Sequence, residues 1–207
     1  MKVLLINGSP HPKGNTAVAL DHVARRLNGH GIETETIWIG NTPVRGCIAC
    51  YGCYKTGRCI FSDELYDKAR AAVETCDGLI MGSPTYYAGP NGSLCALLDR
   101  LFYSSSRFLA GKPGAAVAIA RRGGASTTFE RLNKYFEICN MPVVPSNYWN
   151  IVYGREQGEA ALDKEGMQTM EVLADNMAWM LKAFQAVPHP EYPAKIAYNF
   201  IRPEEEK

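Results

Sequence analysis

The chain has 207 residues, of which 46% are hydrophobic and 21% charged, so it is long enough for one soluble domain with a full hydrophobic core. Its 22 basic and 21 acidic residues give a net charge of +1, which argues against nucleic acid or an anionic membrane as the main partner. The apolar start is too short for a signal peptide, and no apolar run approaches the roughly 20 residues of a membrane span, so we expect a cytoplasmic protein.

Apolar runs alternate with stretches of helical periodicity along the whole chain. In chain order, the predicted elements are strand 2–7, helix 15–31, strand 32–39, helix 62–76, strand 77–84, helix 91–105, strand 113–120, helix 126–140, strand 141–152 and helix 167–185. Five strands that alternate with five helices predict an α/β fold with a parallel sheet. We expect one domain over residues 1–186, followed by an irregular Pro-rich tail over residues 187–207.

Two of the predicted strands end in similar loops, NGSPHPKGNTA and GSPTYYAGPNGS. Ligands of open α/β sheets bind beyond the carboxyl ends of the strands. The first loop leads into a helix, whose amino end offers unpaired N–H groups to a phosphate; an ordinary helix cap is the alternative interpretation. Its spacing differs from G-x-x-x-x-G-K-[ST], which disfavours a nucleoside triphosphate.

The second loop combines aromatic rings with glycines, which suits a planar heterocycle. A third loop, ARRGGAST (residues 120–127), follows the next strand and is expected at the same edge, although its two arginines could simply be solvated charges. Together, one loop for a phosphate and two for a flat ring fit a mononucleotide such as FMN.

These motifs resemble the flavodoxin-like NAD(P)H-dependent FMN reductases, and most closely their iron–sulfur flavoprotein branch. The resemblance covers about residues 1–185 and implies a doubly wound sheet of order 2-1-3-4-5, bound FMN, and a homodimer or homotetramer in which a neighbouring subunit helps enclose the flavin. It assigns FMN contacts to Ser9, His11, Lys13, Asn15, Thr16, Pro84, Thr85, Tyr86, Tyr87, Ala88, Gly89, Arg121, Arg122, Gly123 and Gly124. His11 stands where relatives often have arginine.

Four cysteines occur within thirteen residues, with the spacing C-x2-C-x2-C-x5-C: Cys47, Cys50, Cys53 and Cys59. Such compact spacing suits a [4Fe–4S] cluster, and in iron–sulfur flavoproteins it is the cluster motif. The alternatives are a reduced loop with a structural or subunit-contact role, lined by Tyr51 and Tyr54, or else a zinc site or regulatory disulfide. The remaining three, Cys76, Cys95 and Cys139, are expected to be small buried hydrophobes.

The resemblance implies an oxidoreductase in which FMN takes electrons from NAD(P)H, or from a protein donor, and passes them to a flavin, quinone, azo or nitro compound, or oxygen. No catalytic side chain is assigned, because the chemistry occurs on the flavin; Tyr86 and Tyr87 are candidate substrate contacts. One alternative is a non-enzymatic electron carrier, which the near-neutral charge disfavours relative to acidic flavodoxins. Another is a redox or iron sensor built on the cysteine loop.

Overall fold

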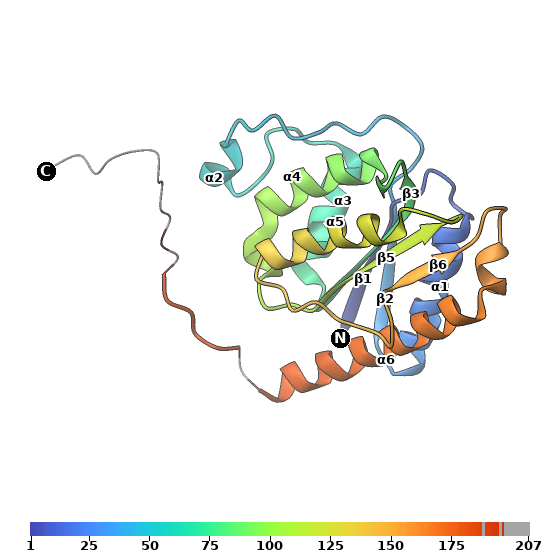
Figure 1. Cartoon of the computed structure of the whole chain (residues 1–207). Helices are drawn as coiled ribbons and strands as arrows, with labels where there is room; N and C mark the ends of the chain where they lie inside the picture. The colour runs from blue at the N-terminus through green and yellow to red at the C-terminus, as the bar shows by residue number, and fades with distance from the viewer. Residues whose placement is uncertain (188, 195, 197–207) are drawn as a thin grey trace, which may run out of the picture.

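The chain folds into a parallel β-sheet between two layers of helices (Figure 1). The computed structural model describes residues 1–187, 189–194 and 196. The parallel strands are β1 (Lys2–Asn7), β2 (Glu33–Trp38), β3 (Gly78–Tyr86), β5 (Gly114–Ala120) and β6 (Ile151–Tyr153), in the order β2-β1-β3-β5-β6. A short strand, β4 (Gly89–Pro90), pairs antiparallel with the end of β3. When the parallel strands alone are counted, the order is the expected 2-1-3-4-5.

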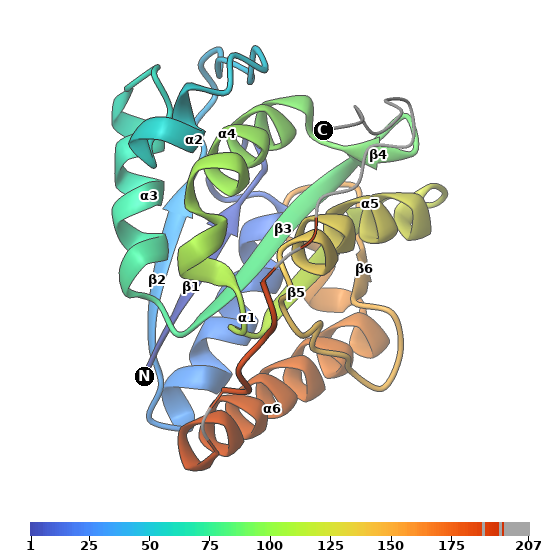
Figure 2. The same cartoon turned by 90° about the vertical axis from the view of Figure 1, so that its left-hand side faces the viewer.

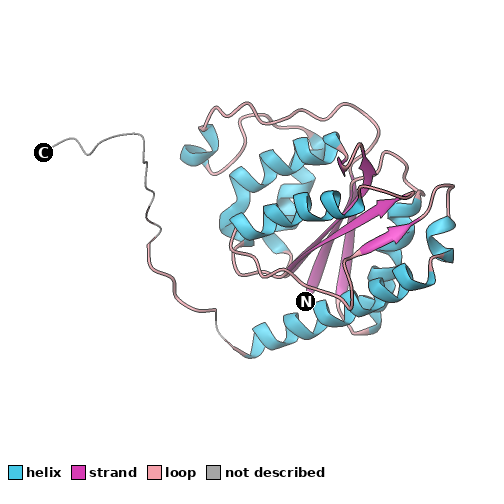
Figure 3. Cartoon of the chain, viewed as in Figure 1, coloured by secondary structure: helices cyan, strands magenta, loops and turns pink. Residues whose placement is uncertain are grey.

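The helices cover both faces of the sheet (Figures 2 and 3). On one face lie α1 (Asn15–Gly29) and α6 (Lys164–Ala186), and on the other lie α3 (Glu64–Thr75), α4 (Gly92–Leu109) and α5 (Ala125–Ile138). Two large hydrophobic cores result, one on each side of the sheet, and a small third cluster lies around the end of β5. The structure therefore confirms the predicted doubly wound α/β, flavodoxin-like class.

Apart from Lys2 and the carboxyl end of β3, the central strands β1, β3 and β5 are buried, which explains their continuous apolar sequences. In β5 the residues are small because helix α5 packs closely against them. A Cβ atom at Gly114 would lie 2.4 Å from the Cδ1 atom of Phe136, so only glycine fits there. This close packing places the start of α5, and the loop before it, directly beyond the end of β5.

The fifth predicted strand, over residues 141–152, is too long. Val143 forms only an isolated bridge to Gly114, and the regular strand β6 spans Ile151–Tyr153. Pro142 and Pro145 interrupt the ladder here because proline has no N–H to donate. The prediction also missed two short helices, α2 (Gly52–Thr56) and η1 (Glu159–Leu162).

The last helix ends at the predicted domain boundary, residue 186. The described tail residues, 187, 189–194 and 196, form neither helix nor strand, and the rest of the predicted tail lies outside the described residues. Among the helices described, none is both long and apolar enough to cross a lipid bilayer.

Candidate functional site

A cleft of about 340 Å³ opens at the carboxyl ends of β1, β3, β5 and β6. Its wall comes from four loops that are far apart in sequence. The lining residues are Ser9, His11, Gly14, Asn15, Thr16, Pro84, Thr85, Tyr86, Ile119, Ala120, Arg121, Gly154, Arg155 and Gln157. The topology thus brings the first three predicted loops together, as the rule for parallel sheets requires.

The loop after β1 is held rigidly around Ser9. The hydroxyl oxygen of Ser9 accepts a hydrogen bond from the His11 N–H (3.1 Å), and the Ser9 N–H donates to Oδ1 of Asn7 (3.0 Å). From the neighbouring strand, Nε1–H of Trp38 donates to the Ser9 carbonyl oxygen (2.7 Å). The backbone of this loop is therefore fixed before any ligand arrives.

Helix α1 begins inside the cleft with an open amino end. Its N-cap residue is Gly14, no described side chain caps it, and its first turn contains no acidic residue. The first N–H groups of a helix need partners and carry a positive partial charge. The exposed cationic side chains of Lys13, Arg121 and Arg155 lie on the same loops. This end of the cleft is suited to an anion.

Asn15 connects the first loop to the loop after β6. Its Nδ2–H donates to the Glu156 carbonyl oxygen (2.9 Å), while its Oδ1 accepts from the N–H groups of Gly158 (3.0 Å) and Ala160 (3.1 Å). Through these three bonds Asn15 holds the fourth wall of the cleft in place. Its second Nδ2–H makes no hydrogen bond among the described residues, so this group and the backbone N–H at the start of α1 remain suited to a phosphate.

The loop after β3 is a tight hairpin in which Thr85 pairs with Pro90 and Tyr86 with Gly89. Its two central residues, Tyr87 (φ 41°) and Ala88 (φ 59°), both have left-handed backbones, as a type I′ turn requires. Non-glycine residues in this region are strained, and such strain concentrates at ligand sites. Tyr86 and Tyr87 are exposed at the tip of the hairpin.

Thr85 carries a second indication of a ligand. Its Oγ1 atom is buried, yet it has no hydrogen-bond partner within the described parts of the chain. An unsatisfied buried hydroxyl costs about 1–3 kcal/mol, so native proteins rarely retain one without a reason. Because Thr85 lines the cleft, a polar group of a bound molecule is the natural partner.

The loop after β5 packs directly on this hairpin. Gly124 has φ +84°, and a Cβ atom there would lie 2.9 Å from Cα of Ala88 and 3.2 Å from Cγ2 of Thr85. Glycine is thus required both by its backbone conformation and by the close approach. Together with Gly123, Gly124 lines an adjoining hollow of about 260 Å³ beside Tyr148 and Trp149.

The cysteine loop, residues 47–59, lies above α4, away from the helix layer of α1 and α6 (Figure 1). Cys47 and Cys50 are exposed, and Cys53 and Cys59 are half-buried. All four line one small hollow of about 20 Å³ together with Arg100 and Tyr103. Burial raises the pKa of the Cys53 thiol, and the three neighbouring cysteines add to this increase.

The backbone of the cysteine loop turns sharply around this hollow. Ala49 (φ 52°), Tyr51 (φ 56°) and Gly57 (φ 67°) are left-handed, and the Ala49 N–H donates to Sγ of Cys47 (3.4 Å). In the described structure, no three His, Cys, Asp or Glu side chains converge closely enough to hold a metal ion. The four thiols thus share one hollow without forming a closed ligand shell.

The sequence over residues 1–156 matches the family described as NADPH-dependent FMN reductase. The chain belongs to this family. An iron-sulfur flavoprotein of Methanocaldococcus jannaschii is 34% identical over 190 residues, covering 88% of this chain and 98% of the relative. Another, from Methanosarcina thermophila, is 32% identical over 192 residues, covering 89% and 97%. The resemblance seen in the sequence, and the oxidoreductase class it implied, are confirmed.

A solved structure with the same fold is that of RosB with a bound intermediate, 8-demethyl-8-formylriboflavin-5'-phosphate. It aligns with a TM-score of 0.72 at 14% identity, covering 98% of this chain and 93% of RosB. At 14% identity, the likeness to RosB shows the shared fold alone.

Of the residues assigned from the family resemblance, eight line the cleft: Ser9, His11, Asn15, Thr16, Pro84, Thr85, Tyr86 and Arg121. Lys13, Tyr87, Ala88, Gly89, Arg122, Gly123 and Gly124 belong to the same loops but do not line it. The sequence analysis did not assign six lining residues: Gly14, Ile119, Ala120, Gly154, Arg155 and Gln157. The last three follow β6, so the rule that placed the other loops at strand ends would have found them.

The remaining cysteines are only partly as expected. Cys76 is buried at the end of α3, whereas Cys95 in α4 and Cys139 at the end of α5 are half-buried. Burial raises the pKa of the Cys76 and Cys95 thiols, which keeps them protonated and unreactive at neutral pH.

Proposed function

We propose that this chain binds FMN in the cleft and uses it as an oxidoreductase. One observation carries the proposal: Thr85, whose buried Oγ1 has no hydrogen-bond partner among the described residues, and the uncapped amino end of α1 line the same cleft. The helix end calls for an anionic group, and the Thr85 hydroxyl calls for a hydrogen-bonding atom such as those of a heterocyclic ring. A phosphorylated flavin has both.

The phosphate would bind at the start of α1. The backbone N–H groups there, with the hydroxyls of Ser9 and Thr16 and the ring of His11, supply donors, and Lys13, Arg121 and Arg155 supply positive charge nearby. The ring would lie against the hairpin formed by Pro84, Thr85, Tyr86, Tyr87, Ala88 and Gly89, with Arg122, Gly123 and Gly124 of the next loop behind it.

When bound, FMN supplies a ring that accepts hydride and releases one or two electrons. The side chains of the protein hold the phosphate, support one face of the ring and leave the other open. The exposed rings of Tyr86 and Tyr87 are placed to contact a substrate beside that open face. The proposed electron donor is NAD(P)H or a protein, and the proposed acceptor is a flavin, quinone, azo or nitro compound, or oxygen.

The four-cysteine loop is proposed to hold a [4Fe–4S] cluster. The supporting observations are the shared hollow lined by Cys47, Cys50, Cys53 and Cys59 and the sharply turned backbone between them. Two relatives that span nearly the same length are iron-sulfur flavoproteins by name. We further propose a cytoplasmic location, where such clusters persist, and a homodimer or homotetramer as the working form.

The test is to titrate the purified protein with FMN and to follow the quenching of flavin fluorescence. Thr85→Val removes the unpartnered hydroxyl while preserving shape, and we expect about a tenfold weaker affinity. Thr75→Val is the matched control, because Thr75 is exposed at the far end of α3. A protein that takes up no FMN would refute the proposal.

Anaerobic stopped-flow mixing of the FMN-loaded protein with NADPH and NADH then tests the enzyme activity. Bleaching of the flavin absorbance within seconds supports the reductase. If the flavin binds but neither nucleotide reduces it, the electron-carrier alternative replaces the reductase.

A further inference from the structure

Arg100, in the middle of α4, is a charged side chain with 0% solvent exposure. Burying a charge is expensive unless the charge is well paired. Arg100 lines the same small hollow as the four cysteines. A buried charge therefore lies directly against the cysteine loop.

The guanidinium group joins the two ends of the cysteine loop. Its Nη2 donates to the carbonyl oxygen of Phe61 (2.8 Å) and to Oδ2 of Asp63 (2.6 Å), and its Nη1 donates to the carbonyl oxygen of Arg45 (3.3 Å). Arg45 precedes the first cysteine, and Phe61 follows the last. One side chain from the helix layer thus holds both limbs of the loop.

Tyr66 reinforces the return limb at the fourth cysteine. The Arg100 guanidinium lies 4.7 Å from the centre of the Tyr66 ring. The hydroxyl of Tyr66 accepts a hydrogen bond from the Cys59 N–H (2.9 Å) and is itself bonded to Ser104 (2.8 Å). The backbone of Cys59 is therefore tied to the same cluster of side chains.

The charge on Arg100 is maintained despite its burial. Arginine stays protonated at every pH at which the protein is folded, and the guanidinium of Arg100 is paired with the carboxylate of Asp63. Asp63 is 43% exposed, so solvent screens its negative charge. The Nε–H of Arg100 has no hydrogen-bond partner among the described residues. The positive charge of Arg100 thus lies beside the hollow, and its Nε–H is a donor that the described residues leave without an acceptor.

We propose that Arg100 is a positioning residue for the cluster: it fixes the cysteine loop at both ends and sets a buried positive charge beside the sulfur ligands. This inference rests on the proposed [4Fe–4S] cluster. Four thiolates give such a cluster a net negative charge, and net charge and hydrogen bonds to sulfur set its reduction potential. A buried cation favours the more negative, reduced form and so raises the potential.

The experiment compares wild-type protein with Arg100→Gln, Arg100→Lys and the control Arg25→Gln, a change at an exposed residue of α1 on the opposite face of the sheet. Each protein is reconstituted anaerobically with ferrous iron and sulfide, and the cluster is titrated with EPR detection. For Arg100→Gln we expect a more negative midpoint potential and about tenfold faster iron loss to a chelator. Arg25→Gln should match the wild type.

A second measurement needs no cluster. The cysteine loop contains the trypsin sites Lys55 and Arg58, both exposed. In the apoprotein, Arg100→Gln and Arg100→Lys should both be cleaved there faster than the wild type, because lysine lacks the fork that binds two carbonyl groups. Arg100→Lys keeps the charge, so its cluster potential should stay near the wild-type value.

Different outcomes would count against the role of Arg100 and against the cluster itself. Wild-type protein that holds no iron would overturn the cluster and, with it, this inference. Wild-type protein with about four irons per chain, but with equal potential and iron retention in Arg100→Gln, would overturn the inference alone. If Arg100→Gln does not fold, Arg100→Lys decides: cleavage at the wild-type rate would count against the positioning role.

Discussion

The indole Nε1–H of Trp38, the last residue of β2, donates a hydrogen bond to the carbonyl oxygen of Ser9 over 2.7 Å. This bond joins the end of one strand to the loop that follows its neighbour. It orients the peptide before Pro10 and so fixes the start of the proposed phosphate site.

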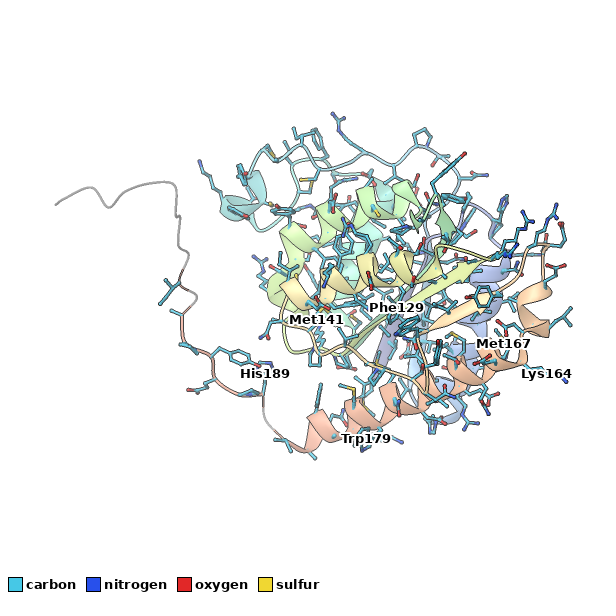
Figure 4. All side chains as sticks on the ribbon, in the orientation of Figure 1. Phe129, Met141, Lys164, Met167, Trp179 and His189 are labelled. Carbon is cyan, nitrogen blue, oxygen red and sulfur yellow. The ribbon has the colours of Figure 1, made fainter. Side chains whose placement is uncertain are left out.

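Replacing Trp38 with Phe keeps an aromatic ring but removes this donor. A neutral hydrogen bond contributes about 0.5–1.5 kcal/mol, so we expect FMN to bind about two- to tenfold more weakly. Fluorescence titration measures the change. Trp179→Phe is the control, because Trp179 lies on the exposed side of α6 (Figure 4). Equal affinities in both variants would show that the bond does not support the site.

Replacing Asn15 with Ala should loosen the loop after β6. Three hydrogen bonds are lost, and two N–H groups, those of Gly158 and Ala160, lose their acceptor. We expect a loss of about 1–3 kcal/mol in the free energy of unfolding and faster hydrogen exchange at those two amides. Asn41→Ala, in an exposed loop, should change neither quantity. Unchanged exchange at Gly158 would contradict the anchoring role.

Gly124 and Gly158 form a matched pair for testing the contact between two loops. Both have positive φ angles, +84° and +90°, so alanine strains the backbone at either position. At Gly158 no described atom lies within 4 Å of the new Cβ, whereas at Gly124 the new Cβ would meet Ala88 at 2.9 Å. Gly158→Ala should cost about 1 kcal/mol, and Gly124→Ala clearly more.

The two variants, Gly124→Ala and Gly158→Ala, should also differ in their affinity for FMN. Gly124→Ala pushes the Thr85–Ala88 hairpin away from its neighbour, so FMN should bind more weakly, while Gly158→Ala should leave affinity nearly unchanged. Urea unfolding and fluorescence titration give the two quantities. Similar values for both variants would mean that the hairpin moves aside without consequence.

Asp175 on α6 makes the contact between α1 and α6 sensitive to acid. Its carboxylate accepts hydrogen bonds from Arg26 (2.8 and 2.9 Å) and His30 (2.6 Å). The Arg26 hydrogen bond is the largest cause that lowers the pKa of Asp175, from 3.8 to about 2. Because the folded-state pKa is depressed, the stabilisation is complete above about pH 4 and is lost as the pH falls toward 2.

The side chain of Asp175 is 37% exposed, so solvent screens these pairs and their contribution should be only about 0.5–1 kcal/mol. Asp175→Asn should therefore lower the free energy of unfolding by this amount at pH 7. The difference from the wild type should shrink as the pH falls below 4. Urea midpoints measured at pH 7, 4 and 3 test this, and a difference independent of pH would exclude the ion pairs as its cause.

The central strands were predictable because their sequences are continuously apolar, and a strand buried on both faces needs no other signal. The fifth strand was overextended because its valines suggested pairing that Pro142 and Pro145 prevent. Helix α2 was missed for a different reason. It has five residues, and its two ends, Tyr51 and Gly57, are set by left-handed backbones rather than by amphipathic periodicity.

At the candidate site, sequence motifs located the loops but not the function of each side chain. Asn15 was assigned only a ligand contact, yet its side chain also makes three hydrogen bonds to a loop 141–145 residues away. Thr85 was placed by family resemblance, while its unpartnered hydroxyl became visible only in three dimensions. The role of Arg100 had no sequence signal, because the sequence of α4 does not distinguish a buried arginine such as Arg100 from a more exposed one such as Arg107.

The open amino end of α1 also links cofactor supply to the folding equilibrium. The first turn of the helix lacks a side-chain cap of its own, so under our proposal an anion completes it. A ligand that binds only the native state adds about 1.4 kcal/mol of stability for each tenfold rise in its free concentration above Kd. A cell short of flavin would then hold less of this protein, since the unliganded population is the one that proteases encounter.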